Sequence, residues 1–438
     1  MAEITTMKTP AETALANLFT LSKATLPGDA EAREEAFSRF ARQGLPHRRV
    51  EEWKYTDLRA AMRDAAPLAP VPSPADAAAA AAAAGPLGAI EAARVTLVNG
   101  HFVRDASDLS GLPEGVEVIP LAEALASHPL LTRMGAVEAA RDNPAYALNA
   151  ALMTDGAVIR VPAGTTVERP IHLRFVNAGE SAFASVTRVL LVAELGAAVT
   201  LIESHEGPDG LAYQTNGVLE IVAGDHTKIR HVRLNAEGME ALALSTLTAK
   251  VGASADFDSL NVVFGSAVSR HQVFLACAGE HSNLRVNGTA MLKGKQHADS
   301  TLLVDHAVPH CTSRELFKTV IDGAATGVFQ GKIIVRPIAQ KTDGRMMSGA
   351  LLLSEEGTMN NKPELEIFAD DVQCAHGATC GQLEETLLFY LMARGLPRPE
   401  AERLMVQAFV GEAIDTVEHE ELRGALLGLV DGWLKARA

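Results

Sequence analysis

The stretch VTRVLLVAELGAAVTLIESHEGPDGLAYQTNGVLEIVAGDHTKIR (186–230) decides the fold. It contains short runs rich in β-branched residues, and each run ends at a glycine that is followed by a small or polar turn. This arrangement returns at intervals of 28, 28 and 27 residues. A repeat of that length, built from strands and turns, is typical of a solenoid whose rungs bury their strands only against neighbouring rungs. The repeating segments are GAAVTLI (196–202), GDHTKIR (224–230), GASADFD (252–258) and GEHSNLR (279–285).

The repeat therefore predicts a mainly β protein with a parallel β-helix core. Each rung is expected to turn at its glycine, where a positive φ costs little. Two other all-β folds stay open at this point. Propeller blades are longer, about 40–45 residues, and carry aromatic motifs, whereas only 5 % of this chain is aromatic. A β-sandwich also has short strands with regular turns.

Helices are predicted on both sides of the repeat. Residues 9–12 (TPAE) fit a capping box, with threonine at the N-cap, proline at the first helical position and glutamate at N3. A second helix is expected from about residue 29 to 43, and further helices follow Gly381. One of the later helices is predicted to bury an apolar face at helical spacing, formed by Ala401, Leu404, Met405, Ala408 and Phe409.

Changes in residue composition and periodicity along the chain divide it into four predicted segments. A run of prolines followed by eight alanines marks a linker; the prolines favour extended chain and the alanines allow a short helix. The predicted segments are an N-terminal helical domain (1–65), an Ala/Pro-rich linker (66–94), a β-helix core (95–370) with short helices near 121–152, and a C-terminal helical domain (371–438).

Charge, cysteine content and the distribution of apolar residues limit the partners and the cellular compartment that we expect for this protein. The formal net charge of −15 argues against nucleic acid or an anionic membrane as the main partner. Four cysteines in 438 residues do not form a disulfide framework. The N-terminus has no basic stretch leading into an apolar run, and no stretch approaches the roughly 18 apolar residues of a membrane span. We expect a cytoplasmic protein.

The sequence contains no familiar hydrolase motif. There is no Gly-x-Ser-x-Gly elbow and no His-Glu-x-x-His. The segment GVFQGKI (327–333) is one residue too short between its glycines for a phosphate loop, and it has Ile333 where a hydroxyl should hold magnesium. We therefore expect no enzymatic activity and no ATP hydrolysis by this chain. A polysaccharide-acting β-helix enzyme is the alternative, although such enzymes need convergent acids and aromatic residues.

The segment DDVQCAHGATCG (370–381) carries the sharpest chemical signal. Cys374, His376 and Cys380 fall within seven residues at the predicted junction between the last β segment and the C-terminal helices. Thiolate and imidazole suit zinc, iron and iron–sulfur clusters. The spacing is not that of a closed zinc site, and a fourth ligand is missing. Spacing alone favours a different interpretation, in which the two cysteines are small buried residues and His376 is a hydrogen-bonded junction residue.

A second group lies in VDHAVPHCTS (304–313), where His306, His310 and Cys311 surround a proline. It is a weaker candidate for ligands. Cys277 ends an apolar run and is expected in the core. Three further histidines follow rung glycines closely and are expected as polar residues of solenoid turns: His226, His281 and His297.

Three segments together resemble the SufB/SufD family of iron–sulfur cluster assembly proteins, and its SufD-type members in particular. VEEWKYTDL (50–58) is similar to the family's N-terminal Trp-Lys-Tyr-Thr motif. NNKPELEIFADDVQCAHGATCG (360–381) resembles its most characteristic stretch, and residues 389–414 resemble its C-terminal helical signature. SufB-type chains carry a cysteine just before the proline of the last β segment, and this chain has none there. VTLVNGHFV (95–103) and residues 147–162 also fit, so the resemblance spans nearly the whole chain.

The resemblance implies a right-handed parallel β-helix between helical ends and a non-catalytic scaffold role. It implies that the end of the β-helix pairs with a SufB-type paralogue and that the C-terminal helices dock the SufC ATPase. A nascent iron–sulfur cluster would then be held transiently, shared with the paralogue, by His376 with Cys374 beside it. Cys380 departs from the family, which commonly has an apolar residue there, so no role is transferred to it. Because β-helix edges can pair with like edges, we also expect that the lone chain can form a homodimer.

Overall fold

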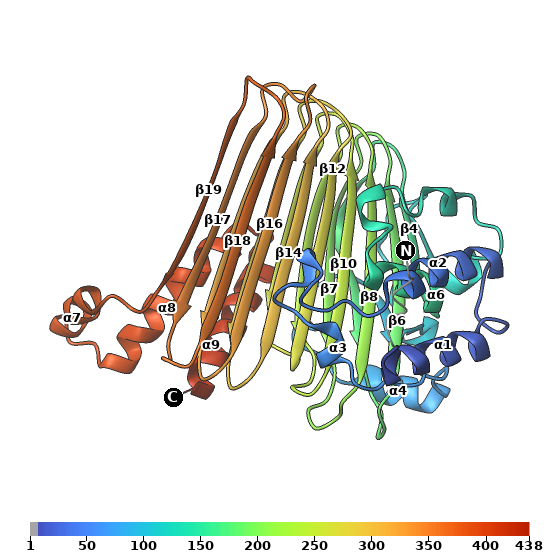
Figure 1. Cartoon of the computed structure of the whole chain (residues 1–438), viewed down its shortest axis with the longest axis horizontal. Coiled ribbons are helices and arrows are strands. Elements are labelled where there is room, and N and C mark those ends of the chain that lie inside the picture. Colours follow the sequence, from blue (N-terminus) through green and yellow to red (C-terminus); the bar gives the residue numbers. More distant parts are fainter. Residues whose placement is uncertain (1–7, 438) are drawn as a thin grey trace, which may run out of the picture.

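The computed structural model describes residues 8–437, and its centre is a parallel β-helix made of two facing sheets (Figure 1). From β4 onward, consecutive strands alternate between the sheets, so each strand pairs in parallel with the strand two places later in the chain. At the N-terminal end, β2 and β3 pair antiparallel with β1 and β4. The first sheet contains β1 (Ala93–Val98), β2 (His101–Phe102), β5 (Thr166–Val176), β7 (Ala198–Glu206), β9 (Lys228–Ala236), β11 (Asp256–Val263), β13 (Asn283–Leu292), β15 (Thr312–Ile321), β17 (Asp343–Leu352) and β19 (Gln373–Gly381).

The second sheet contains β3 (Glu117–Pro120), β4 (Asp155–Val161), β6 (Ala184–Ala193), β8 (Gln214–Ala223), β10 (Leu242–Val251), β12 (Val268–Cys277), β14 (His297–His306), β16 (Thr326–Val335) and β18 (Thr358–Ile367). Inward-facing apolar side chains of both sheets form one core along the solenoid. The mainly β fold and the parallel β-helix predicted from the repeat are confirmed. The propeller and the sandwich are excluded, since neither stacks strands in this alternating parallel order.

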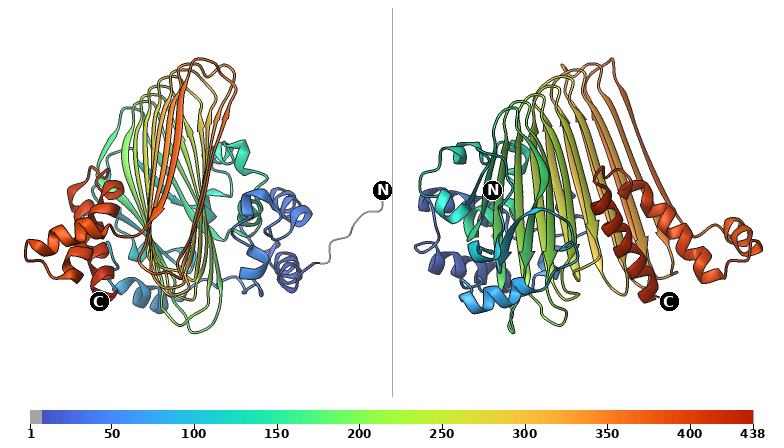
Figure 2. Two further views of the ribbon diagram at one scale, coloured as in Figure 1. Left: turned by 60° about the vertical axis from the view of Figure 1, so that its left-hand side comes forward. Right: turned by 180° about the vertical axis from the view of Figure 1, so that it is seen from behind.

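Two groups of helices cover opposite outer faces of the solenoid (Figure 2). The N-terminal group packs on the second sheet, and the C-terminal group packs on the first sheet. The first group contains α1 (Pro10–Ser22), α2 (Ala30–Gln43), α3 (Leu58–Ala61), α5 (Leu121–Ala124) and α6 (Pro144–Leu152). The second contains α8 (Arg398–Ile414) and α9 (Glu420–Arg437), while α7 (Glu385–Ala393) projects beyond them. No helix among residues 8–437 is long and apolar enough to cross a bilayer.

The helix ends follow the predicted chemistry. Thr9 accepts a hydrogen bond from the Glu12 backbone, and the Glu12 side chain accepts one from the Thr9 backbone, which completes the capping box. Asp29 caps α2, and Gly44 ends it with a φ of 69°. The alanine run forms α4 (Pro74–Ala82), and the residues after it are packed rather than free, because Leu87 is fully buried beneath the C-terminal helices.

Glycine is required at the rung positions for a reason that differs from the predicted one. Gly224, Gly252 and Gly279 do not adopt a positive φ; a left-handed residue follows two positions later, at His226, Ser254 and His281. The glycines are needed for close stacking, because a Cβ at Gly252 would lie 2.7 Å from the Gly224 carbonyl carbon in the turn below. Only the first of the four glycines, Gly196, has a positive φ, of 68°.

The segment that follows α2 binds the middle of the solenoid. Trp53 is 1 % exposed and lies 3.8 Å from the Arg270 guanidinium in a cation–π contact. Arg270 pairs with Asp299 in a fully buried ion pair, and the Thr56 hydroxyl donates a hydrogen bond to the same carboxylate. His297, which we expected in a turn, is instead the first residue of β14 and lies 2.8 Å from the Thr56 hydroxyl.

Candidate functional site

The C-terminal end of the β-helix is open. Strands β18 and β19 are the last strands of the two sheets, and each is paired on one side only, with β16 and β17 respectively. No residue of either strand is buried. An unpaired edge presents a row of backbone N–H and C=O groups that another strand can complete. The open end therefore offers two strand edges whose backbone groups have no neighbouring strand.

Cys374 and His376 lie inside β19, on the face that continues the core. In the sheet register Cys374 lies beside Gly344, and His376 lies beside Met346, which is buried in the core. Because side chains in neighbouring strands at one register point to the same face, both residues lie on the interior side of the solenoid end. Cys374 is half-buried against the core, whereas His376 is exposed.

This placement corrects one predicted boundary. We expected the β-helix to end at residue 370 and the helical segment to begin at 371, but β19 continues to Gly381 and the first helix begins at Glu385. The cysteine–histidine segment is thus part of the last strand of the β-helix, although we predicted it in the C-terminal helical domain. Its small residues and glycines hid its strand character. Cys380 is exposed near the end of the same strand.

The ligand set at the open end is incomplete. Among residues 8–437, neither Cys374 nor His376 belongs to a group of three His, Cys, Asp or Glu residues whose ligand atoms all lie within 4.8 Å of one another. Burial raises the pKa of the Cys374 thiol, so this side chain is a neutral thiol at physiological pH unless a metal deprotonates it. Cys374 and His376 therefore offer two candidate donor atoms, one thiol sulfur and one imidazole nitrogen.

A buried acid lies beneath His376. Glu315 is beside Met346 in the register, which places it two strands below His376 in the same interior column. It is 3 % exposed, and neither of its carboxyl oxygens has a hydrogen-bond partner within the described part of the chain. Burial raises the pKa of Glu315 to about 8. No feature of the local sequence marks this residue; only the strand register relates it to His376.

The structure changes the membership of the second predicted cluster, which was His306, His310 and Cys311. His310 lies in an exposed turn with a φ of 61°, where its ring stacks on His281 at 4.8 Å, and it does not join the group. Cys277, which we expected only as a core residue, comes together with His306 and Cys311. The ligand atoms of these three buried residues all lie within 4.8 Å of one another. The length of the repeat could have predicted this grouping, because Cys277 and His306 are register partners in adjacent rungs.

Hydrogen bonding polarises this buried cluster. A hydrogen bond from Cys277 lowers the pKa of the Cys311 thiol to about 4, against the opposing effect of burial. The same hydrogen bond, together with burial, raises the pKa of Cys277 well above its usual value. No disulfide joins any of the four cysteines, all of which lie in the described part of the chain.

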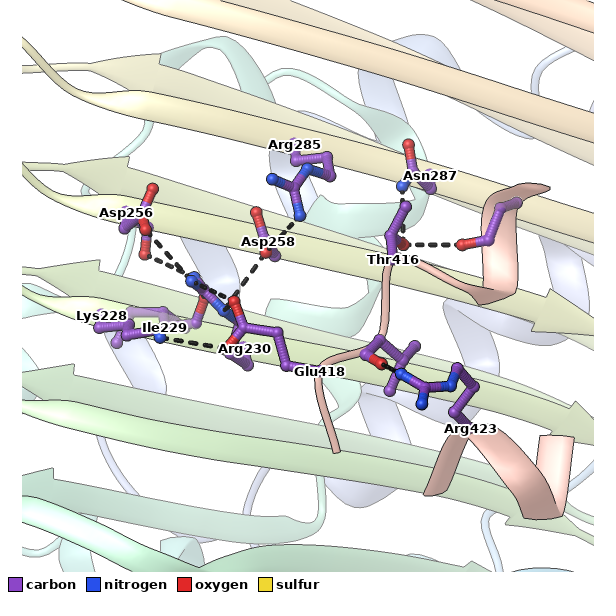
Figure 3. Close-up of polar contacts among 12 residues, drawn as sticks. Lys228, Ile229, Arg230, Asp256, Asp258, Arg285, Asn287, Thr416, Glu418 and Arg423 are labelled. Carbon is purple, nitrogen blue, oxygen red and sulfur yellow. Dashed lines mark hydrogen bonds and ion pairs between the residues drawn. The ribbon is translucent and has the colours of Figure 1, made fainter. Parts of the chain in front are cut away.

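The C-terminal helices are anchored to the solenoid by the segment between α8 and α9 (Figure 3). The Arg230 guanidinium donates to Glu418 at 2.9 Å and forms an ion pair with Asp258 at 3.3 Å. The Asn287 amide donates to the Thr416 hydroxyl at 3.0 Å. These contacts reach β9, β11 and β13, so the helix pair is fixed across several rungs.

The helix α7 and the adjacent part of α8 expose apolar side chains. The face predicted for α8 is buried at Ala401 but wrong at Leu404 and Ala408, which are exposed. The helix buries Val406 and Val410 instead. Large apolar side chains that are exposed close together in the chain make a segment a candidate interaction site. We call this set the α7 patch; its members are Leu387, Phe389, Tyr390, Met392 and Leu404.

Comparison with known proteins assigns the chain to a family. Residues 175–409 match the model of the "SUF system FeS cluster assembly, SufBD core domain", and residues 13–173 match the "SufBD protein N-terminal region". An iron–sulfur cluster assembly SufBD family protein of Synechocystis is 32 % identical over 87 % of this chain and 86 % of its own length.

Two proteins named "Iron-sulfur cluster assembly protein SufD" are also similar. The one from Escherichia coli is 28 % identical and covers 91 % of each chain, and the one from Bacillus subtilis is 26 % identical and covers 66 % of each. The matched regions include the solenoid, the open end with Cys374 and His376, and most of α8. The chain therefore belongs to the SufB/SufD family of iron–sulfur cluster assembly proteins and is of the SufD type.

Proposed function

We propose that this chain is a non-catalytic scaffold subunit that pairs with a SufB-type paralogue through its open end and docks a SufC-type ATPase through its C-terminal helices. The observation that carries the proposal is the open end itself. Two strand edges are unpaired there, and one of them, β19, carries an exposed histidine and a half-buried cysteine on the face that continues the core. A paralogue with the same fold has matching strands with which to complete both edges.

His376 and Cys374 are proposed as the chain's own ligands to a nascent iron–sulfur cluster, which is the cargo of the assembly and not a resident cofactor. Because the two side chains form only part of a ligand set, the remaining donors come from the paralogue. A histidine nitrogen is a less basic and uncharged donor compared with a thiolate, and this suits a cluster that must be passed on.

The α7 patch is proposed as the docking surface for the ATPase. Helix α7 projects from the body of the protein, and its exposed aromatic side chains are the kind that anchor interfaces. Movement of the bound ATPase would be transmitted through α8 and α9 to the rungs that Arg230 and Asn287 anchor. Nucleotide hydrolysis belongs to the partner in this scheme, and the family membership leaves no observation in favour of a polysaccharide-acting enzyme.

The cytoplasm is the proposed compartment. Four free cysteines, of which Cys380 is exposed and Cys374 half-buried, are compatible with a reducing environment. The net charge of −15 gives no electrostatic reason to bind nucleic acid or an anionic membrane.

The decisive test is anaerobic co-purification with the SufB-type and SufC-type partners, with iron and sulfide measured in the complex. His376→Ala should leave the complex intact and lower its cluster content. His376→Cys should restore part of that content, because a thiolate can replace the imidazole as a ligand. Cys380→Ala is the matched control on the same strand and should keep the wild-type content.

Each other outcome removes a stated part of the proposal. Unchanged cluster content in His376→Ala would make this residue a structural contact only. Loss of content in both His376→Ala and His376→Cys would assign it a hydrogen-bonding role. Failure of the wild-type chain to form the complex would contradict the scaffold role itself.

A further inference from the structure

Three buried side chains meet inside the solenoid, two strands away from the open end. Cys277 is the last residue of β12, His306 is the last residue of β14, and Cys311 immediately precedes β15. Each of the three is 0 % exposed. They come from neighbouring rungs and meet inside the solenoid at the corner where the chain passes from the second sheet to the first.

Their geometry matches one edge of a tetrahedral metal site. The Nδ1 atom of His306 lies 3.7 Å from the Cys277 sulfur. Metal–sulfur and metal–nitrogen bonds of about 2.3 and 2.0–2.1 Å at a tetrahedral angle separate the two donor atoms by roughly 3.6 Å. The Cys311 sulfur completes a triangle whose sides are all 4.8 Å or less. A small inward shift of these side chains is enough to coordinate one ion.

The surroundings prepare the imidazole for this role. The Nε2 atom of His306 is 3.0 Å from the Ser313 hydroxyl, so a proton on Nε2 can be held there and the Nδ1 lone pair faces the sulfurs. Such an outer hydrogen bond normally fixes the tautomer of a metal-bound histidine. The Ser282 hydroxyl donates to the Cys311 sulfur at 3.2 Å, and the Gly279 carbonyl oxygen lies 3.4 Å from the same sulfur, so polar groups hold this side chain in place.

Charge balance selects the ion. Two thiolates and one neutral imidazole carry a charge of −2, which a divalent cation neutralises, and a neutral site is what a fully buried position requires. Thiolate and imidazole together favour zinc or ferrous iron over magnesium or calcium. We propose that Cys277, His306 and Cys311 bind one divalent zinc or ferrous ion inside the β-helix.

The proposed ion is distinct from the cluster at the open end. Ser313 is beside Gly344 in the register, and Gly344 is beside Cys374, so the site lies two strand spacings, roughly 10 Å, below Cys374. The ion would link β12, β14 and the turn before β15, and so it would stabilise two adjacent rungs. This inference does not depend on the proposed partners or on a cluster at His376.

The test uses the full-length chain, reduced and stripped of metal under anaerobic conditions, with Co²⁺ as the spectroscopic probe and Zn²⁺ as its competitor. We expect one equivalent of Co²⁺ with the thiolate charge-transfer and tetrahedral ligand-field bands, displaced by Zn²⁺. Cys277→Ser and Cys311→Ser should lose these bands. The double variant Cys374→Ser/Cys380→Ser, which keeps the buried pair, should retain them. Ser313→Ala should weaken Zn²⁺ binding by about 10- to 100-fold.

A second measurement covers the case in which the buried variants fail to fold. In the wild-type chain, one equivalent of Zn²⁺ should protect Cys277 and Cys311, but not Cys380, from alkylation during partial unfolding, as read by peptide mass spectrometry. Three results overturn the proposal: no metal bound by the reduced chain, metal lost only in the Cys374→Ser/Cys380→Ser variant, or a Cys277–Cys311 disulfide, seen as a 2 Da mass loss, that forms in place of metal binding.

Discussion

At the scale of single residues, the glycine rhythm predicted the fold, although it did so for an incomplete reason. We inferred turns with a positive φ at each glycine, but three of the four glycines are required by stacking and the left-handed positions lie two residues later. A sequence shows which positions exclude side chains. It does not show whether backbone conformation or a neighbouring rung excludes them.

Replacing Gly279 by alanine should destabilise the protein, because the added Cβ would collide with the backbone of Ala253 in the turn below. Overpacking of this kind costs about 1–3 kcal/mol. Gly381→Ala is the matched control, since a Cβ there has no atom within 4 Å in the described structure and the position lies at the end of an edge strand. Thermal unfolding followed by circular dichroism measures both. Equal midpoints for the two variants would contradict the stacking explanation.

Glu315 should make stability depend on pH. Its pKa is raised from 4.5 to about 8 in the folded chain, so the folded state holds the proton more tightly than the unfolded state does. The corresponding stabilisation is fully present below pH 4.5 and is lost as the pH rises through 8. Glu315→Gln should unfold at nearly the wild-type temperature at pH 5. At pH 9 it should be more stable than the wild type by a few kcal/mol, at about 1.4 kcal/mol per pKa unit.

Thermal unfolding of both proteins from pH 5 to 9 checks this expectation. All other titrating groups are shared, so their contributions cancel in the difference between the two curves. Parallel curves across this range would show that the Glu315 carboxyl is not held neutral.

At the scale of elements, caps and strand runs were predictable and the orientation of α8 was not. The capping box at residues 9–12 depends on two neighbouring side chains, so local sequence determines it. Helix α8 carries apolar residues around most of its circumference, and a spacing count cannot tell which stripe meets the sheet. The solenoid decides that question, because Val406 and Val410 pack with its outer face while Leu404 remains exposed.

The α7 patch gives a prediction at this scale. Phe389 is 74 % exposed, so Phe389→Asp should leave the unfolding midpoint unchanged while it abolishes co-elution with the SufC-type ATPase in size-exclusion chromatography. Leu21→Asp is the control: Leu21 is 80 % exposed on α1, on the opposite side of the solenoid. Retained co-elution in Phe389→Asp, or its loss in Leu21→Asp, would place the ATPase elsewhere.

At the scale of the whole molecule, the architecture was predictable because a solenoid repeats the same local solution many times. The candidate site was predictable only in part. Cys374 and His376 are close together in the sequence. Glu315 lies near His376 only because β15, β17 and β19 are neighbours in the sheet, and Cys277 lies near His306 only because β12 and β14 are neighbours. Such relations become visible only once each rung has been aligned with the next.

The open end should also let the isolated chain associate with itself. If two copies pair edge to edge about a two-fold axis, a charge added to β19 meets its own copy. Gln373→Lys/Thr379→Lys, at two exposed positions of β19, should therefore convert a homodimer to a monomer. Analytical ultracentrifugation of the wild type and the variant measures this, with Thr20→Lys/Leu21→Lys on α1 as the control. A monomeric wild type at all concentrations would contradict the expectation.

The docking of Trp53 and Thr56 on Arg270 and Asp299 has a consequence for biosynthesis. The N-terminal segment leaves the ribosome first, yet the carboxylate that Thr56 binds lies 243 residues later in the chain. During synthesis the early rungs can stack on one another while this segment stays undocked and open to proteases and chaperones. Translation must pass β14 before Asp299 is available, so a chain truncated before that strand would keep its early rungs and the helices α1 and α2 that pack on them. Only the segment around Trp53 and Thr56 would lack its carboxylate partner.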